Sequence, residues 1–375
     1  MPDATQPTGS LLTWLDDSAA GLCAGTADSA ALLPRLAAAG LFHAGVPQAL
    51  GGAGGDVTDA VAEIARVSER SLTAGFVFWG HRTFIEYLLQ SPNRELRARL
   101  LPDLLDGRVA GATGLSNAMK FLSGLEELQV VGHGEAAGHE AVGRDGFGYR
   151  LDGKLPWVTN LRPSGFHVAA AVAHADGSGA FVASLPHDAP GLTRSPDLDL
   201  MAMRGSDTAA IDLAGVRIGA AQILHPHAAS WLPQVRPAFL GMQCGMSIGL
   251  ARRALAEAAG RAGAARQVLR DPLAAASTQL SSLEAALRDG LRRDAFHAAP
   301  AALFELRIAL AGVAAEAVAL ELQASGGRAY LSPFGDGFAR RWKEAAFLPV
   351  VTPSLVQLKA ALAAQQPRLP ADQAA

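Results

Sequence analysis

The sequence contains few cysteines and no excess of positive charge. It holds only two cysteines, Cys23 and Cys244, which stand far apart and in no C-x-x-C pair. This argues against a disulfide framework and a cysteine-ligated zinc site, and it fits a reducing cytoplasm. The 32 basic and 35 acidic side chains leave a formal charge of -3, without the basic excess that nucleic acids or anionic membranes attract. We therefore expect no nucleic-acid partner.

Targeting and membrane-spanning segments are also missing from the sequence. The chain begins Met-Pro-Asp-Ala-Thr, without a basic region followed by an apolar run, so no secretory signal is predicted. Further along, no stretch reaches the roughly 18 uninterrupted apolar residues of a transmembrane helix. The expectation is a cytoplasmic protein without a membrane partner.

Metal and nucleotide motifs are incomplete. No H-E-x-x-H or C-x-x-C motif accompanies the histidines His81, His225, His227 and His297. Structural or solvated roles are therefore favoured for them, and no metal is predicted. The glycine-rich run 51–55 lacks the G-K-[ST] ending of a P-loop and follows no predicted strand. It is therefore interpreted as a surface turn.

Hydrophobic periodicity divides the chain into three parts. With 375 residues and 50% hydrophobic content, the chain is long enough for two or three domains. From Leu11 to about Leu105 the apolar residues recur at helical spacing. After Gly111 alternating and short apolar runs predict strands, with a hairpin turn at Asp152-Gly153.

The helical period returns after Trp231. One stripe has the 3-4-3-4-3 spacing of a helix face and consists of Leu303, Leu306, Leu310, Val313, Ala317 and Leu320. Long helices with such stripes cannot bury their apolar faces singly, which favours a bundle. The sequence thus predicts an α+β protein with a helical domain over 10–111, an antiparallel β domain over 112–222 and a helical bundle over 223–365.

The segment from Gly153 to Asn160 is the strongest single motif. Its order G-K-L-P-W-V-T-N resembles the G-x-K-x-W-I-T-N segment of the acyl-CoA dehydrogenase superfamily. The resemblance implies that Trp157 packs on a flavin ring and that the Thr159 hydroxyl approaches its reactive edge. A planar, electron-accepting ring needs such a flat wall and a few fixed hydrogen bonds. Taken alone, Trp157 could equally be a core residue of the β domain.

Other motifs follow the family's order over residues 30 to 358. The turn from Val46-Pro47 to Gly51-Gly52, the Gly205-Ser206-Asp207-Thr208 stretch and the Gln323 to Tyr330 element all have counterparts. The resemblance implies a small β-barrel-like middle domain and a C-terminal four-helix bundle. It also implies that Gln323, Gly326 and Gly327 contact the adenosine half of FAD in a neighbouring subunit, and hence a homodimer or homotetramer.

Two expected FAD contacts match the family only in part. Thr113 stands at the start of a family segment that contacts the flavin, but the following Gly114-Leu115-Ser116-Asn117 is shortened. Ser116 is expected to replace the pyrophosphate-binding serine, because a hydroxyl and backbone N–H groups suit phosphate oxygens. Arg266 is the approximate counterpart of an arginine that reaches the neighbour's FAD, without the aromatic residue and glycine that follow it in the family.

The usual catalytic base is missing. The family's Glu, which removes the α-proton of an acyl thioester, falls on Thr352, and Ser354 takes the hydroxyl position of the same motif with an expected flavin contact. The alternative base position falls near Phe239. A threonine cannot act as a carboxylate base near neutral pH. Either another carboxylate such as Glu344 or Asp336 reaches the site, or the flavin chemistry differs.

The resemblance therefore leaves three functions open. FAD-dependent α,β-dehydrogenation of an acyl thioester ranks first, because the likeness extends along nearly the whole chain. A flavin-dependent monooxygenase acting on another apolar substrate is second, since enzymes of this kind on the same scaffold need no such glutamate. A non-catalytic flavoprotein is third.

Overall fold

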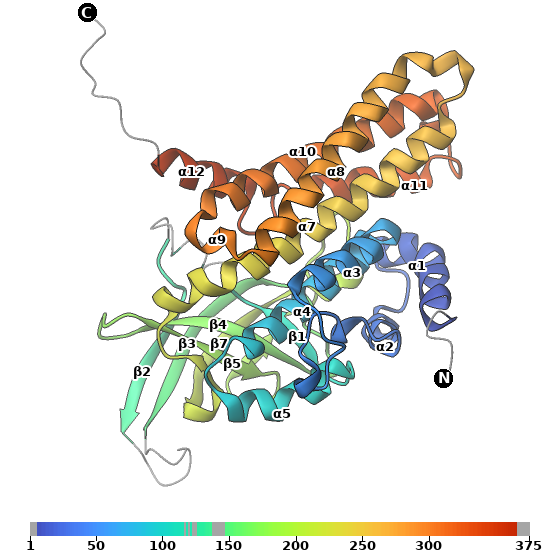
Figure 1. Ribbon diagram of the computed structural model, residues 1–375. Helices are drawn as coiled ribbons and strands as arrows, with labels where there is room; N and C mark the ends of the chain where they lie inside the picture. The colour runs from blue at the N-terminus through green and yellow to red at the C-terminus, as the bar shows by residue number, and fades with distance from the viewer. Residues whose placement is uncertain (1–5, 116–117, 119–120, 122–125, 137–146, 366–375) are drawn as a thin grey trace, which may run out of the picture.

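Helices form both ends of the chain and the strands of a sheet lie between them in sequence (Figure 1). The computed structural model describes residues 6–115, 118, 121, 126–136 and 147–365. The N-terminal α-helices are α1 (Gln6–Ala24), α2 (Leu32–Ala38), α3 (Val57–Arg70), α4 (Leu72–Leu89) and α5 (Arg94–Leu105). Short 3-10 turns over 29–31, 41–43 and 48–50 connect them.

Local sequence explains how these helices begin. Asp56 caps α3: its carboxylate accepts from the Thr58 amide at 2.7 Å, while Asp59 accepts from the Asp56 amide at 2.8 Å. Such reciprocal bonds satisfy amides that the first helical turn leaves free. Ser71 caps α4 by accepting from the Ala74 amide. Helix α4 is apolar on all sides and is buried through most of its length, as expected of a central helix.

The middle of the chain folds into one twisted sheet. Its strands are β1 (Ala110–Thr113), β2 (Val130–Ala136), β3 (Phe147–Val158), β4 (Phe166–His174), β5 (Ala180–Pro186), β6 (Leu192–Arg194), β7 (Ala209–Gly219) and β8 (Ile223–His225). Their order is β6-β7-β3-β2-β4-β5-β8, and β1 pairs with β4. Predicted strands over Phe166–Val172 and Ala180–Leu185 are confirmed by β4 and β5.

Two details of the predicted β domain were wrong. The sheet is mixed and not purely antiparallel, because β1 and β2 both pair with β4 in parallel. The expected hairpin at Asp152-Gly153 is instead a bulge within the continuous strand β3, where the register with β7 shifts after Leu151. The Asp152 carboxylate accepts from the Gly215 amide of β7 at 2.8 Å, which fixes the bulge across the ladder.

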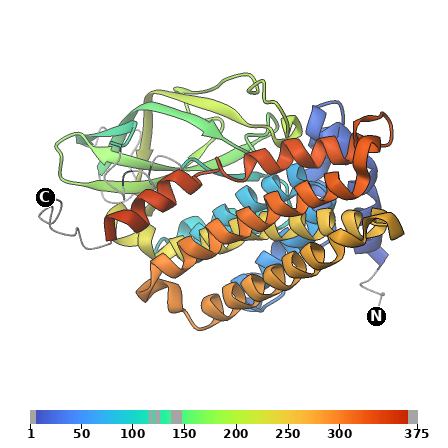
Figure 2. The same cartoon turned by 90° about the horizontal axis from the view of Figure 1, so that it is seen from above.

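The C-terminal part is helical, as predicted. It contains α7 (Ala228–Arg261), α8 (Arg270–Arg292), α9 (Ala295–Ala298), α10 (Pro300–Ser325), α11 (Asp336–Phe347) and α12 (Leu355–Gln365), with 3-10 turns η6 (Ala264–Leu269) and η7 (Gly326–Tyr330). Figure 2 shows the long helices running side by side. The predicted stripe on α10 faces the core, since Leu310 and Ala317 are fully buried. The predicted fold class is confirmed.

Glycines let α7 approach α3 closely. A Cβ atom at Gly249 would lie 2.2 Å from the Ala65 carbonyl oxygen, and one at Gly245 would lie 2.8 Å from the Val61 carbonyl oxygen. Their spacing of four residues puts both glycines on one face of α7. The N-terminal and C-terminal helices are thereby packed backbone to backbone.

The described helices include none with the length and apolarity that a membrane crossing requires. The expected domain limits at 111 and 222 stay a prediction. The buried hydrophobic residues between Leu11 and Leu358 form one connected cluster, so the core does not mark a boundary at either position.

Candidate functional site

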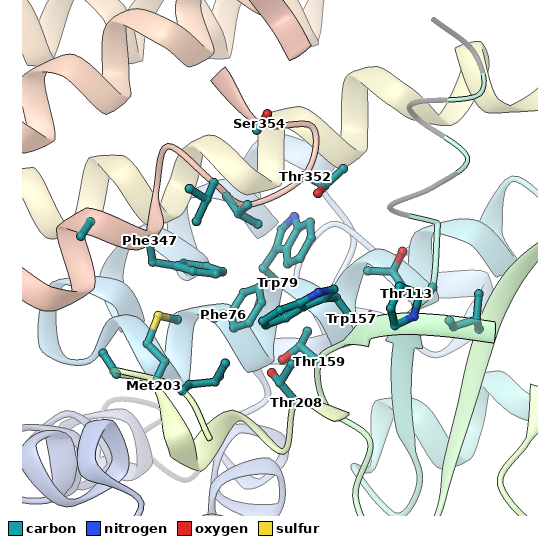
Figure 3. Close-up of a pocket in the computed structure, with 18 of the residues that line it drawn as sticks. Phe76, Trp79, Thr113, Trp157, Thr159, Met203, Thr208, Phe347, Thr352 and Ser354 are labelled. Atoms are coloured by element: carbon teal, nitrogen blue, oxygen red, sulfur yellow. The ribbon is translucent and has the colours of Figure 1, made fainter. Parts of the chain in front are cut away.

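A cavity of about 650 Å³ opens where the sheet, helix α4 and the C-terminal helices meet. This volume is in the range of small-molecule and cofactor sites. Its described wall is mostly apolar, with the hydroxyl groups of threonines and a serine interspersed. Figure 3 shows these side chains converging from the sheet on one side and from the segment after α11 on the other.

The sheet side of the cavity carries three of the predicted flavin contacts. Trp157, near the end of β3, lines the cavity with its side chain 59% exposed, so it is not the core residue of the alternative interpretation. Thr159 is buried, and its hydroxyl donates to the Ser206 carbonyl oxygen at 3.2 Å. Thr113 at the end of β1 lies 3.0 Å, hydroxyl to hydroxyl, from Tyr87 of α4. A flat aromatic surface thus lies beside two fixed hydroxyl groups.

Aromatic rings form the helical side of the cavity. Phe76 and Trp79 of α4 are stacked with centroids 5.7 Å apart, and Trp79 meets Phe239 of α7 edge to face at 5.2 Å. Phe347 at the end of α11 packs edge to face on Phe76 at 4.7 Å. Such offset and T-shaped contacts are the favoured geometries of aromatic pairs. They give the cavity an apolar wall of interlocked rings on this side.

Strained backbone surrounds the base of the cavity. Asn160, Met203 and Asp207 have φ values of 62°, 60° and 49°, a left-handed conformation that is uncommon for residues other than glycine. Hydrogen bonds hold them there: the Asn160 amide donates to the Ser206 carbonyl at 2.9 Å, and Ser29 donates to the Asp207 carboxylate at 3.0 Å. Strain of this kind gathers at binding sites, where neighbouring contacts enforce it.

The segment between α11 and α12 supplies Thr352 and Ser354. Both line the cavity, and the flavin contact expected of Ser354 stays a prediction. The Ser354 amide donates to the Gln357 side chain at 2.7 Å, and its hydroxyl accepts from the Gln357 amide at 3.3 Å, so the two residues cap the start of α12. The Thr352 carbonyl accepts from the Gln243 side chain at 3.0 Å.

No carboxylate occupies either expected base position, since Thr352 and Phe239 line the cavity there. Glu344 is completely buried outside the lining and accepts from Arg340 at 2.8 Å; burial raises the pKa of its carboxyl group, although Arg340 opposes this. Asp336 is exposed and accepts from the Ser332 hydroxyl. Neither of them lines this cavity. Glu126 is the carboxylate among the described lining residues.

Other predicted FAD contacts lie away from the cavity. Gln323, Gly326 and Gly327 lie at the end of α10 and the start of η7, where Gln323 and Gly327 are exposed. They do not line the cavity of their own chain. Arg266 lies in η6, and its side chain is outside the described part, as is Ser116 altogether. The roles of these five residues stay predictions.

Sequence reasoning missed much of the aromatic wall. Phe76 and Trp79 stand three residues apart on α4, so they share one face of that helix, and this spacing was the available signal. Phe347 and Met203 carried no local signal, because only the tertiary fold brings them to the cavity.

His81 has a structural role. His81 is fully buried between the Leu104 carbonyl and the Gly111 amide, each 2.9 Å from a ring nitrogen. Burial lowers the pKa of His81 to about 3, so the ring is neutral and accepts from Gly111. Within the described ranges, no group of three or more His, Cys, Asp or Glu side chains has the arrangement of a metal site.

Known proteins resemble the chain in both sequence and structure. Residues 23–108 match the model of the acyl-CoA dehydrogenase N-terminal domain. The probable acyl-CoA dehydrogenase YngJ of Bacillus subtilis is 27% identical over 191 residues, which cover 49% of this chain and 47% of that protein. The mitochondrial isovaleryl-CoA dehydrogenase of Pongo abelii is 26% identical over 192 residues, 49% and 42% of the two chains. The chain spans about half the length of these curated relatives.

Solved structures match over nearly the whole chain. Butyryl-CoA dehydrogenase of Megasphaera elsdenii has a TM-score of 0.79 at 17% identity, covering 97% of this chain and 98% of that one. KijD3, solved with FMN and a dTDP-linked amino sugar, has a TM-score of 0.77 at 19% identity over 96% and 92%. Dibenzothiophene monooxygenase of Paenibacillus sp. A11-2 has a TM-score of 0.74 at 18% identity over 95% of each chain. The chain therefore has the fold of the acyl-CoA dehydrogenases and of the flavin-dependent enzymes related to them, and its residues 23–108 match that family's N-terminal domain.

Proposed function

We propose that the protein is a flavin-dependent oxidoreductase and that the cavity holds the flavin ring beside an apolar substrate. The observation that carries this proposal is the meeting of Trp157, Thr113 and Thr159 in one cavity of suitable volume. An exposed aromatic face suits a planar ring system. The Thr159 hydroxyl donates to Ser206, so its oxygen lone pair can accept from a ring N–H group. The residues present therefore fit the cofactor.

The chain's own residues would bind and orient the flavin ring and shield the substrate from water. Trp157 would form the wall behind the ring, while Thr113 and Thr159 would set its orientation. Phe76, Trp79 and Phe239 would hold an apolar substrate and keep water out of the cavity. When bound, the flavin would supply two-electron redox chemistry.

We propose FAD as the flavin and a homodimer or homotetramer as the active form. The exposed positions of Gln323 and Gly327, away from the cavity of their own chain, support a role toward a second copy. Glycine permits close approach of backbone to a ligand, which suits an adenosine contact.

For the reaction, the geometry favours oxygen transfer to an apolar substrate. Neither Thr352 nor Phe239 can take a proton from carbon near neutral pH, and both stand where a base would be needed. The largely apolar wall with its hydroxyl groups meets the needs of oxygen transfer better. The fold is shared by a monooxygenase and by dehydrogenases, so it is compatible with this choice without deciding it.

Dehydrogenation of an acyl thioester is the second candidate, supported by the two curated relatives, which are acyl-CoA dehydrogenases by name. It needs a carboxylate base, and among the described lining residues that leaves Glu126. This residue is exposed on the segment before β2.

The Glu126→Gln variant separates the two reactions. After loading with FAD, wild type and variant are mixed anaerobically with short- and medium-chain acyl-CoA compounds, and flavin bleaching is followed by absorbance. In parallel, chemically reduced protein is mixed with oxygen and a panel of apolar aromatic compounds. We expect that the thioesters do not bleach the flavin in either protein. We also expect that the oxygen consumed matches the amount of oxygenated product, to the same extent in wild type and variant. Bleaching that Glu126→Gln slows at least about 100-fold would establish dehydrogenation instead.

A further inference from the structure

A buried arginine without a carboxylate lies behind the cavity wall. Arg307 of α10 is fully buried. No carboxylate of the described residues lies among the groups that shift its pKa, which burial lowers, and its Nη1 atom has no hydrogen-bond partner. Leaving a buried charge unpaired is costly unless hydrogen bonds and dipoles replace the counter-charge. The contacts of Arg307 therefore need an explanation.

The first contact is with the end of α11. The Arg307 Nη2 atom donates to the Leu348 carbonyl oxygen at 2.6 Å, and Leu348 directly follows the last residue of that helix. The C-terminus of a helix carries partial negative charge from its free carbonyl groups, so a cation there is stabilised. The helix end thus takes the place of the missing carboxylate.

The second contact reaches the cavity through one side chain. Arg307 Nε donates to the Gln243 carbonyl oxygen Oε1 at 2.8 Å, and Gln243 Nε2 donates to the Thr352 carbonyl at 3.0 Å. Gln243 is fully buried on α7. Because Arg307 can only donate, the Gln243 amide must turn its oxygen to Arg307 and its nitrogen to Thr352. The orientation of the amide is therefore dictated by the arginine.

We infer that Arg307 and Gln243 are positioning residues that hold the segment 348–352 in place as a wall of the cavity. Arg307 fixes the beginning of this segment at Leu348, and Gln243 fixes it again at Thr352. Both anchors come from α7 and α10, helices that pack along each other. The lining residues Val350 and Val351 lie between the two anchors. The significance of this wall for catalysis rests on the proposed function, whereas its positioning does not.

Gln243→Glu tests the inference without removing the arginine. A carboxylate at this position can still accept from Arg307 and would supply the absent negative charge. It cannot donate to the Thr352 carbonyl, so the second anchor is lost while the first remains. We expect the variant to melt no lower than the wild type, yet to exchange the backbone amides of residues 350–358 about fivefold faster.

The measurement is hydrogen exchange followed by mass spectrometry on the full chain without added ligand. The amides concerned include Val351, bonded to the Phe347 carbonyl at 3.2 Å, and Leu355, bonded to the Pro349 carbonyl at 2.9 Å. Arg307→Met, which removes both anchors, should raise exchange there about tenfold or more. Unchanged exchange in folded Gln243→Glu would overturn the inference.

Arg341→Met is the matched control. Arg341 is also buried, lies on α11 itself and pairs with Glu321 of α10, and neither residue lines the cavity. We expect this variant to have a lower melting temperature without a selective increase in the exchange of the backbone amides of residues 350–358. An increase there as large as that in Gln243→Glu would count against the inference. If Arg307→Met does not fold, Arg307→Lys serves, because lysine keeps the charge but cannot reach both carbonyl groups in the fork geometry of arginine.

A second readout links the wall to the cavity. FAD titration of Gln243→Glu should give nearly unchanged affinity, whereas the KM for any substrate found should rise several-fold with a smaller change in kcat. Failure to bind FAD at all in wild-type protein would contradict the proposed function and leave the exchange result standing on its own.

Discussion

Trp157 exposes more than half of its surface although it stands in a cavity among buried aromatic residues. Truncating it to alanine should therefore cost the free protein little stability. If its ring faces a flavin, Trp157→Ala should weaken FAD binding by roughly 10–100-fold, since stacked aromatic contacts contribute about 1.5–3 kcal/mol with their buried area. The melting shift on adding FAD, which depends on affinity for the folded state, measures this.

Trp342→Ala is the control for that variant, because Trp342 of α11 is 48% exposed and does not line the cavity. It should keep the full FAD-induced shift. An undiminished shift in Trp157→Ala would mean that the flavin lies against another wall.

The buried His81 predicts a specific acid sensitivity. Its pKa is about 3 in the folded protein, against about 6.5 when unfolded, so below pH 6.5 the unfolded chain binds a proton that the folded chain does not. The resulting loss of stability begins near pH 6.5 and continues toward pH 3. At pH 5 it amounts to about 2 kcal/mol.

Urea unfolding at pH 7.5 and pH 5 tests this with His81→Gln. The variant should be less stable at pH 7.5, because its side chain replaces two good hydrogen bonds imperfectly. It should also lose about 2 kcal/mol less than the wild type on going to pH 5. The partly buried His167, whose pKa burial lowers to about 4, is common to both proteins and cancels. Equal losses in both proteins would refute the assignment.

At the scale of elements, the crossing of α3 and α7 depends on glycine. A methyl group at Gly249 would overlap the Ala65 carbonyl oxygen and the Glu69 amide nitrogen, which are backbone atoms that cannot rotate away. Gly249→Ala should therefore destabilise the protein by about 1–3 kcal/mol. The comparison is Gly312→Ala on α10, where nothing lies within 4 Å and alanine should stabilise by up to about 1 kcal/mol. Denaturant midpoints of the two variants should move in opposite directions.

The elements also show how far sequence patterns reach. The α10 stripe was predictable because an apolar period of 3.6 is a local property. The bulge at Asp152-Gly153 was not, since the same dipeptide makes a hairpin turn unless a neighbouring strand holds it extended. Here the Gly215 amide of β7 binds the Asp152 carboxylate, a contact with a residue 63 positions away. The parallel pairing of β1 with β4 depends on similarly distant residues.

The candidate cavity residues came from the resemblance to family motifs and not from hydrophobic periodicity. Trp157, Thr159, Thr113, Thr352 and Ser354, which the resemblance to family motifs brought together, all line one cavity, and their flavin contacts stay predictions. The pattern could not show that Glu344 is buried away from the cavity, because one helix carries both Phe347, which lines the cavity, and the buried Glu344 within a single turn. Only the packing of α11 against its neighbours decides which side of the helix meets the cavity.

At the scale of the whole molecule, an apolar segment is left exposed beside the predicted adenosine contacts. Tyr330, Leu331 and Phe334 are 84%, 56% and 60% exposed and follow Gly326 and Gly327 closely in sequence. Neighbouring exposed apolar residues of this size mark protein contacts more often than open surface. We therefore expect at least a dimer at micromolar concentration.

Phe334→Asp should weaken the assembly, because it replaces an apolar ring at the proposed contact with a carboxylate that must lose its hydration there. Sedimentation velocity checks the mass, and an unchanged circular dichroism spectrum checks the fold. A wild-type protein that sediments as a 38.7 kDa monomer would contradict the expectation directly.

The walls of the cavity come from positions as far apart as Phe76 and Gln357. During synthesis the chain emerges from the ribosome N-terminus first, so α4 and the sheet are available well before the segment that carries Thr352 and Ser354. A ligand held by all these walls can bind only after that late segment has docked. The concentration of ligand in the cell would then affect the docking of this last segment. A higher concentration would increase the fraction of newly made chains that is folded and so protected from proteolysis.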